Sequence, residues 1–355
     1  MSSGMDYAPR AKQRKVVASG EFGFAAVGLD HGHIYGICHG LVDAGGELLS
    51  VYDPDPAKVN AFRQQFPGAV AASLEEVLEN PRIDLVASAA VPADRGPLGL
   101  EVQRVGKHYL SDKAPFTSLE QLEAARESVT RTGKKWAVCY SERLQNESAV
   151  YAGQLIEQGA IGRVLQVVGM GPHRLQAENR PDWFFKKERY GGILTDIGSH
   201  QIEQFLYYSG ASDASILNAR VANHAHPEYP ELEDFGEASL VADNGASNYF
   251  RVDWFTPAGL STWGDGRTFI LGTDGYIELR KYLNVAVDPT GDHLFLVNHE
   301  GEQHFPVAGK VGFPYFGELI LDCLNGTETA MGQDHAFKAA ELCLKVQAAA
   351  DEAGN

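Results

Sequence analysis

The sequence predicts an α/β protein in which a doubly wound parallel sheet precedes a second α+β domain with a mostly antiparallel open sheet. Through the first 140 residues, short apolar runs alternate with segments of helical periodicity, which is the pattern of a parallel sheet. Later strand-like runs follow one another directly, and Asn244 and Gly245 separate two of them as in a hairpin. At 355 residues the chain is long enough for two domains.

Each expected strand is a short apolar run, and each expected helix carries apolar residues three or four positions apart, as Val59, Phe62 and Phe66 do. The strands of the first domain are 22–29, 48–53, 83–91, 108–111 and 136–140, and its helices follow the first strand and cover 56–66, 73–78, 98–105 and 119–130. The strands of the second domain are 163–169, 215–224, 236–242, 247–255, 268–271, 276–280 and 294–298, with helices over 149–158, 316–324 and 337–349.

These elements place the domain boundaries. We expect a flexible tail over residues 1–20, a parallel-sheet domain over 21–143 and a second domain over 144–355. The tail carries four basic residues but no apolar run that could form the core of a signal peptide.

The composition argues against several classes of partner. A net charge of −17 opposes binding to nucleic acids or anionic membranes, because both need a cationic protein surface. No window reaches the ~18 consecutive apolar residues of a membrane span. The four cysteines lack C-x-x-C pairing, which favours reduced thiols and a cytoplasmic protein.

The turn after the first expected strand has part of a phosphate-binding fingerprint. Gly28 holds the first position of G-x-G-x-x-G, but Asp30 and His33 hold the second and third, and Gly32 is out of register. A turn of this kind places the pyrophosphate of a dinucleotide at the N-terminus of the next helix. The altered loop alone predicts a nucleotide site less specifically than three glycines would.

Asp53, at the end of the second expected strand, adds to this pattern. A carboxylate there accepts hydrogen bonds from the adenosine ribose hydroxyls and repels a 2′-phosphate, which favours NAD over NADP. The alternative is a turn residue in D-P-D-P, because Asp before Pro commonly opens a turn.

Lys113 follows the fourth long strand of the first domain, at the edge of the sheet where α/β proteins bind ligands. A lysine beside a nicotinamide ring and a substrate hydroxyl could lower the pKa of the alcohol and relay a proton. The alternative is a solvated surface lysine.

Asp196 and His200 lie four residues apart in an expected helix, so their side chains share one face and can touch. An aspartate held against one ring nitrogen fixes the tautomer of a histidine and leaves the other nitrogen free to take a proton. The alternative is an ordinary ion pair on a helix surface. Gly191, Gly192 and Gly198 favour the functional interpretation, because glycines in a helical stretch indicate close approach to another group.

Polar and aromatic residues near this stretch are candidates for a sugar-binding pocket, because a sugar ring packs on an aromatic face and needs hydrogen-bonding groups. They are Arg143, His173, Arg180, Asp182, Trp183 and Tyr190. Trp183 has the alternative of packing in the core. The spacings His31-x-His33 and His224-x-His226 suggest metal ligands, but no thiolate or carboxylate set accompanies them at zinc spacing, and we expect no metal.

Three motifs, in order, resemble those of the Gfo/Idh/MocA oxidoreductases, and the resemblance runs from residue 22 to about 350. Residues 106–108 and 111–115 (G-K-H and S-D-K-A-P) are similar to the family's G-K-H-V-x-x-E-K-P. Residues 191–200 are similar to its G-G-G-x-L-x-D-x-G-x-H, and 272–278 to its G-T-E-G-x-I-E turn. The resemblance implies an N-terminal Rossmann domain that binds NAD(P), and a C-terminal domain that binds substrate and forms dimers or tetramers through its open sheet.

Carried over residue by residue, the family's catalytic lysine, aspartate and histidine fall on Lys113, Asp196 and His200. The implied cofactor contacts are Gly28, Asp30, His31, Gly32, His33, Asp53, Pro92, Asp112 and Lys113. The implied substrate contacts are Lys113, Arg143, Trp183, Asp196 and His200.

Four positions depart from the family pattern. Asp30 and His33 replace two loop glycines, and a carboxylate near a pyrophosphate is unfavourable unless it points away. Asp112 replaces a glutamate. Gly96 stands where many members carry a histidine, so that contact is expected to be lost.

The resemblance implies an NAD-dependent dehydrogenase of a sugar, cyclitol or related polyol. Two alternatives stay open: a redox-neutral elimination or glycoside cleavage with tightly bound NAD, and a non-catalytic nucleotide sensor, because a fold does not prove an activity.

Overall fold

The computed structural model describes residues 4–11 and 13–354, which form two compact units. The parallel-sheet unit contains Met5–Cys139 and Phe313–Phe337, and the mixed-sheet unit contains Tyr140–Gly312, the chain from Lys338 on, and Gly4. Within the described residues no helix is both long enough and apolar enough to span a bilayer.

The parallel-sheet unit is built on six parallel strands in the order β3-β2-β1-β4-β5-β6, which is the doubly wound order of a Rossmann fold. The strands are β1 (Gly23–Val27), β2 (Glu47–Tyr52), β3 (Val70–Ala71), β4 (Leu85–Ser88), β5 (His108–Asp112) and β6 (Trp136–Cys139). The predicted fold class of this domain is confirmed.

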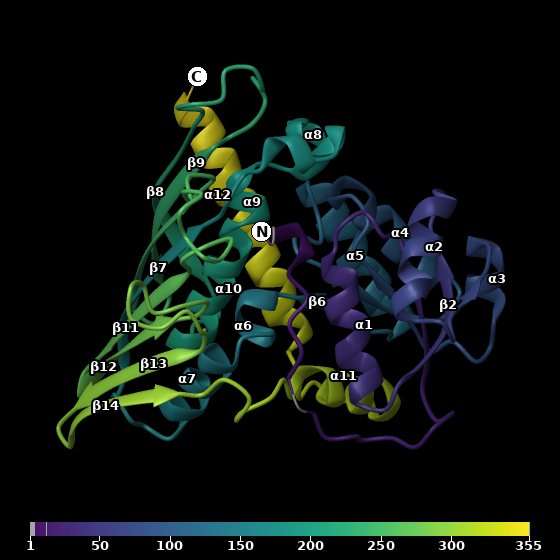
Figure 1. Cartoon of the computed structure of the whole chain (residues 1–355), viewed down its shortest axis with the longest axis horizontal. Helices are drawn as coiled ribbons and strands as arrows, with labels where there is room; N and C mark the ends of the chain where they lie inside the picture. Colours follow the sequence, from purple (N-terminus) through teal and green to yellow (C-terminus); the bar gives the residue numbers. More distant parts are fainter. Residues whose placement is uncertain (1–3, 12, 355) are drawn as a thin grey trace. The chain divides into compact units, whose positions relative to one another are not determined.

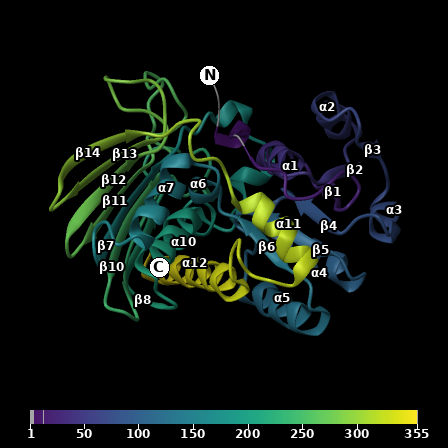
Figure 2. The ribbon, with the colours of Figure 1, turned by 90° about the horizontal axis from the view of Figure 1, so that it is seen from below.

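Helices cover both faces of this sheet, with α1 on one face and α4 and α5 on the other (Figure 2). They are α1 (His33–Asp43), α2 (Pro56–Gln65), α3 (Leu74–Glu79), α4 (Pro92–Arg104), α5 (Leu119–Thr132) and α11 (Tyr315–Asn325). Local signals set their ends: Asp55 caps α2, Ser73 and Glu76 form a capping box on α3, and Gly133 ends α5 in a left-handed conformation.

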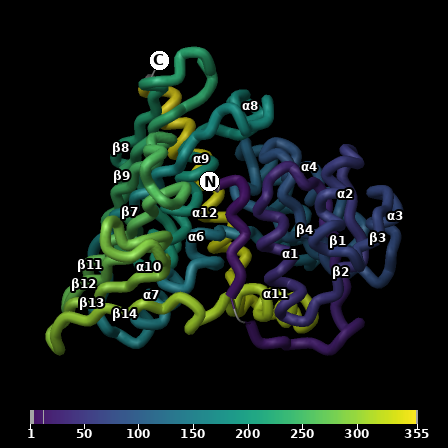
Figure 3. The backbone as a smooth tube through the Cα atoms, in the orientation of Figure 1, coloured from purple at the N-terminus to yellow at the C-terminus, as the bar shows by residue number. Residues whose placement is uncertain are grey.

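The chain before β1 belongs to this unit and does not behave as the expected tail. Arg10 pairs with Asp43 at 3.0 Å, and the amide of Val16 donates to the carbonyl of Ala44 at 2.9 Å. Figure 3 shows this purple segment running beside α1 before it enters β1. The expected boundary at residue 20 therefore moves to about residue 5; the part of the expected tail at residues 1–3 and 12 lies outside the described residues.

Residues 313–337 also complete the parallel-sheet unit, although the sequence placed them in the second domain. The helices α1 and α11 lie side by side (Figures 1 and 2). A Cβ added to Gly40 would lie 2.3 Å from the ring of Phe316, so the glycine lets the two helices approach. The Tyr315 hydroxyl donates to the Val138 carbonyl at 3.1 Å, which ties α11 to β6. The second domain is thus interrupted, because side-chain contacts rather than chain order decide where this segment packs.

The mixed-sheet unit holds eight strands in the order β14-β13-β12-β11-β7-β10-β9-β8. They are β7 (Val164–Pro172), β8 (Ala214–Ala222), β9 (Phe235–Ala242), β10 (Ser247–Asp253), β11 (Arg267–Gly272), β12 (Gly275–Arg280), β13 (His293–Asn298) and β14 (Gly301–Pro306). The pair β7–β10 is parallel and the other neighbours are antiparallel, so the predicted mostly antiparallel sheet is confirmed. Asn244 and Gly245 form the predicted hairpin between β9 and β10. The sequence analysis missed β14, whose G-E-Q-H-F-P sequence lacks an apolar pattern.

Helices α7 and α10 lie on one face of this sheet (Figure 2), and α10 packs on β7 and β10. The α-helices of the unit are α6 (Ser141–Leu144), α7 (Glu147–Glu157), α8 (Lys187–Tyr190), α9 (Ile193–Asp196), α10 (Gly198–Ser209) and, from Lys338 on, α12 (Gln333–Gly354). Burial alternates along β9, β10 and β11, which is the pattern of a sheet with one face packed on helices.

The contact between α1 and α11 gives a test of the unit boundary. Gly40→Ala should lower the free energy of unfolding by about 1–2 kcal/mol in urea titrations, because the added methyl overpacks against Phe316. The control is Gly68→Ala, whose Cβ would meet nothing within 4 Å and which should change stability by less than about 0.5 kcal/mol. Equal stabilities for the two variants would contradict this packing.

Candidate functional site

The first part of the candidate site is the turn that follows β1. Gly28 has a φ of +72°, and a Cβ there would lie 2.6 Å from the Cβ of Ala90. Its amide donates to the carbonyl of Tyr52, and its carbonyl accepts from the amide of Ala89. Both the conformation and the close approach require glycine, so the first glycine of the fingerprint has a physical reason in this chain.

Asp30 replaces the second loop glycine, and the structure supplies a counter-charge. Its carboxylate lies 2.5 Å from the ammonium of Lys58, which is also 3.8 Å from Asp53. This ion pair offsets the negative charge of Asp30, which the sequence analysis expected to repel a bound pyrophosphate. That analysis missed Lys58, which lies in the first turn of α2, two residues after D-P-D-P.

Asp53 is buried at the carboxyl end of β2 and organises the turn. One carboxylate oxygen accepts from the amide of Leu29 at 2.7 Å and the other from the amide of Asp55 at 2.9 Å. The second hydrogen bond closes the D-P-D-P turn, which was the alternative role predicted for Asp53. Each oxygen keeps a further lone pair, so the turn role leaves capacity to bind hydroxyl groups.

His33 stands at the third glycine position of the fingerprint, and its ring lies against Asp112. The Nδ1 of His33 lies 3.0 Å from Oδ1 of Asp112, and the His33 amide donates to Nδ1 of His31 at 3.3 Å. Burial, together with the nearby His33, lowers the pKa of His31 well below its usual value. His31 is therefore a neutral ring. Because its Nδ1 accepts the hydrogen bond from the His33 amide, the ring proton is on Nε2.

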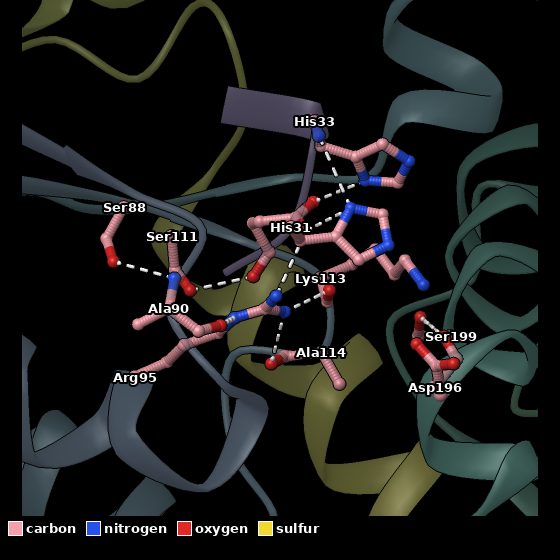
Figure 4. A network of polar contacts seen from close by, with 11 residues as sticks. His31, His33, Ser88, Ala90, Arg95, Ser111, Lys113, Ala114, Asp196 and Ser199 are labelled. Carbon is pink, nitrogen blue, oxygen red and sulfur yellow. Dashed lines mark hydrogen bonds and ion pairs between the residues drawn. The ribbon is translucent and has the colours of Figure 1, made fainter. Parts of the chain in front are cut away.

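Arg95, in α4, is another residue of this site that the sequence analysis missed (Figure 4). Its side chain is 1% exposed, and its Nε donates to the carbonyl of Ala90 at 2.7 Å. Nη1 donates to the carbonyls of Lys113 and Ala114. Nη2 donates to Asp112 at 3.1 Å. Arg95 is next to Gly96, the position where many family members carry a histidine. That departure from the family pattern was the only signal in the sequence that pointed to this segment.

The charge of Asp112 is balanced within this network. Burial raises the pKa of Asp112, but His33 and Arg95 outweigh it and hold the pKa well below its usual range. The ligand atoms of Asp112, His31 and His33 lie within 4.8 Å of one another, which is a candidate metal geometry. Arg95 already neutralises the carboxylate, so the network is satisfied as hydrogen bonds and ion pairs, and the expectation of no metal stays a prediction.

Two further predicted residues lie at this edge of the sheet. Lys113 follows β5 and is 5% exposed, which is inconsistent with a solvated surface lysine. Pro92 is the first residue of α4, where proline is favoured, and is buried. Gly32 ends the turn as the N-cap of α1.

The predicted single helix around Asp196 and His200 is interrupted. The helix α9 ends at Asp196 and α10 begins at Gly198. The amide of His200 donates to the carbonyl of Ile197, three residues back, while the Asp196 carbonyl accepts from the Ser199 hydroxyl at 2.6 Å (Figure 4). The continuous helix was therefore a wrong prediction, because the serine side chain takes the carbonyl that a regular helix would use. A contact between the Asp196 and His200 side chains stays a prediction.

Gly192 in this stretch marks a close approach. Gly192 has a φ of +92°, and a Cβ there would lie 2.2 Å from the side chain of Gln347. That glutamine accepts from the amide of Leu194 and donates to Glu233, whose carboxylate also accepts from the amide of Ile193. The start of α9 is thus anchored by buried side chains of α12 and of the chain before β9.

Glu142 places a buried negative charge near His200, which the sequence analysis did not anticipate. It is 2% exposed, and its Oε2 accepts from Lys281 at 3.0 Å and from Gln201 at 3.2 Å. Oε1 is buried and has no hydrogen-bond partner among the described residues. Burial raises the pKa of Glu142, but Lys281, His200 and His173 outweigh it and lower the pKa to about 2.

The same network fixes α10. Gln204 accepts from Lys281 at 2.7 Å and donates to the carbonyl of His200 at 2.8 Å. His200 is 2% exposed and lies in the first turn of α10, next to Gln201 in the sequence. An ionised carboxylate near a histidine favours the protonated ring, which is the property a general base needs.

Two of the expected substrate contacts, Arg143 and Trp183, have structural partners. Arg143 is buried and forms an ion pair with Glu203, with Nε 2.7 and 2.9 Å from the two carboxylate oxygens. Its guanidinium also lies 3.8 Å from the ring centroid of Tyr207. Trp183 is half-buried and contacts Phe184 edge to face. Substrate contact by either residue stays a prediction.

Comparisons with known proteins agree with this geometry. The model of an oxidoreductase family with an NAD-binding Rossmann fold matches residues 22–140, and that of the Gfo/Idh/MocA C-terminal domain matches residues 150–278. The chain belongs to the Gfo/Idh/MocA family. It is thus an oxidoreductase, as the motifs implied.

Relatives of this Gfo/Idh/MocA protein include a solved structure from Erwinia carotovora atroseptica SCRI1043, provisionally designated an oxidoreductase, with 49% identity, a TM-score of 0.90, and coverage of 93% of this chain and 99% of that one. A scyllo-inositol 2-dehydrogenase (NAD(+)) of Bacillus subtilis is 27% identical over 78% of this chain and 79% of its own length. A D-xylose dehydrogenase of Paenarthrobacter nicotinovorans is 26% identical over 53% of this chain. The match spans about half (48%) of the length of that enzyme.

The buried charge of Glu142 predicts a pH dependence of stability. Its pKa is about 2 in the folded protein and 4.5 for an ordinary glutamate, so its contribution is complete above about pH 4.5 and is lost as the pH falls towards 2. From pH 6 to 3.5, the free energy of unfolding should fall about 1–2 kcal/mol more in the wild type than in Glu142→Gln. Urea titrations at both pH values measure this, with the exposed Glu300→Gln as control. The same pH slope in all three proteins would exclude an ionised Glu142.

Proposed function

We propose that the chain is a dehydrogenase that transfers hydride between NAD and a hydroxyl-bearing carbon of a sugar, cyclitol or related polyol. The observation that carries the proposal is the turn after β1, where only glycine fits at position 28 and Asp53 closes the neighbouring strand. The names of the inositol and xylose dehydrogenases among the relatives support the substrate class.

The residues around this turn fit a dinucleotide. Asp53 would accept hydrogen bonds from the adenosine ribose hydroxyls and repel a 2′-phosphate, which favours NAD. A pyrophosphate would lie at the N-terminus of α1, where His31 offers Nε2–H and Lys58 offsets the charge of Asp30. Gly32, His33, Pro92 and Asp112 complete the proposed cofactor site. When bound, the nicotinamide supplies the hydride chemistry.

Three side chains would carry the proton chemistry. Lys113 would polarise the substrate hydroxyl, and His200 would take its proton as the hydride leaves the same carbon. Asp196 would orient His200, and the buried charge of Glu142 would stabilise the imidazolium. Arg143 and Trp183 would contact the remainder of the substrate.

The test is a panel of inositols, aldoses and anhydro sugars assayed by NADH absorbance, after calorimetric titration with NAD and NADP. We expect NAD to bind more tightly than NADP, and His200→Ala to lower turnover by about 10²–10⁴-fold with little change in NAD affinity, because the proton acceptor is lost. Substrate conversion without NADH accumulation would instead support a redox-neutral reaction. Binding of neither cofactor would favour the sensor alternative and contradict a dehydrogenase.

The outer face of the mixed sheet supports a homodimer or homotetramer. Exposed apolar side chains lie on β10, β11 and β12. Leu271 pairs with Tyr276 across the strands, and Tyr249 and Phe269 both align with Val168 of β7. An apolar row of this kind on a regular sheet fits a second copy of this chain. The described cysteines are free thiols, of which three are buried, and this supports a cytoplasmic protein.

The dimer proposal predicts the behaviour of a charge placed in this row. Phe269→Glu should shift the protein to monomer in sedimentation velocity, because the carboxylate would be desolvated in the interface. The matched control is Val70→Glu on β3, an exposed apolar residue of the other unit, which should keep the wild-type mass. A wild-type protein that is monomeric at all concentrations would contradict the proposal.

A further inference from the structure

We infer that Arg95 is a positioning residue that holds the backbone at Lys113 for the proposed hydride transfer. The inference rests on the proposed function for the role of Lys113, but the geometry of Arg95 stands without it. Its guanidinium reaches the chain on both sides of the lysine: the side chain of Asp112 before it, and the carbonyls of Lys113 and Ala114 at and after it.

The chain at Lys113 needs such a donor. Regular pairing ends at Asp112, the last residue of β5, and the chain then continues without strand or helix hydrogen bonds until α5. Lys113 and Ala114 are both buried, and a buried carbonyl without a donor costs free energy comparable to a lost hydrogen bond. The side chain of Arg95 donates hydrogen bonds to both carbonyls.

Two further hydrogen bonds and the burial of its side chain fix the position of Arg95. Its Nε donates to the carbonyl of Ala90 at the end of β4, and its backbone carbonyl accepts from the Tyr109 hydroxyl at 3.0 Å. The side chain is 1% exposed, so it has little freedom to move. Arg95 thereby joins α4, the end of β4 and the segment after β5 into one rigid unit at the carboxyl edge of the sheet.

An arginine is needed for this arrangement. The planar fork presents donors in fixed directions, and here three nitrogens serve four acceptors. A lysine would keep the positive charge beside Asp112 but offers a single nitrogen on a flexible stem. Mutation can therefore separate the charge of Arg95 from its hydrogen bonds to the backbone carbonyls.

Four variants separate the two roles. Arg95→Lys keeps the charge and loses the fork, and Arg95→Met loses both. The double variant Arg95→Met/Asp112→Asn removes the two opposite charges together, so that no buried carboxylate is left unpaired. The matched control is Lys107→Met, which removes a buried cation that donates to the carbonyls of Asn80 and Ile83 at the opposite end of β5.

The readouts are hydrogen–deuterium exchange of a peptide covering residues 110–118, and kcat, KM and NAD affinity measured on folded protein. We expect faster exchange in that peptide for all three Arg95 variants, and a kcat about 10–100-fold lower with NAD affinity changed by less than about fivefold, because a displacement near 1 Å at a reacting group costs rate rather than binding. Arg95→Lys should recover part of kcat. Lys107→Met should lose stability but keep wild-type exchange in 110–118 and wild-type kcat.

Two results would overturn the inference. Wild-type kcat in the double variant would show that Arg95 only balances the charge of Asp112. Unchanged exchange in residues 110–118 of Arg95→Met would show that the guanidinium does not hold this segment. If the wild-type protein turns over no polyol, the proposed function fails, and the exchange experiment still decides whether Arg95 positions Lys113.

Discussion

The parallel-sheet unit depends on one buried negative charge, that of Asp112 at the end of β5. Burying a carboxylate away from water costs free energy unless charged or hydrogen-bonding groups surround it. Arg95 and His33 are such partners for Asp112. Their backbones belong to α4 and α1, so satisfying the charge also fixes how the first and fourth turns of the sheet meet. The residues that replace the two loop glycines both have polar partners: Asp30 pairs with Lys58, and His33 lies against Asp112.

Features with a local cause could be predicted from the sequence. The strand and helix alternation, the short helix that begins after Ser73 and the Asn244–Gly245 hairpin each depend on a few neighbouring residues, and these predictions were correct. Gly28 was predictable for the same reason, since its backbone conformation excludes other residues. The motif spacing then placed Lys113 at the end of β5, where the structure has it.

Features that depend on pairing through space could not be predicted. Arg95 and Lys113 are 18 residues apart and Glu142 and Lys281 are 139 apart, and nothing in either local sequence identifies its partner. The break between α9 and α10 depends on a competition between the Ser199 hydroxyl and the His200 amide for acceptors, which periodicity does not reveal. Likewise, the packing of α11 on α1 depends on the fit of Phe316 over Gly40.

The two units, although their folds differ, use the same electrostatic device. Each buries a carboxylate near imidazole groups and pairs it with a cation: Asp112 with Arg95 in one, and Glu142 with Lys281 in the other. The cation prevents the carboxylate from taking a proton itself, so the negative charge persists when an adjacent imidazole becomes protonated. A histidine that gains a proton during hydride transfer needs such a neighbour, since the imidazolium would otherwise be an uncompensated buried charge. In the proposed mechanism, the charge of Glu142 would have this role beside His200.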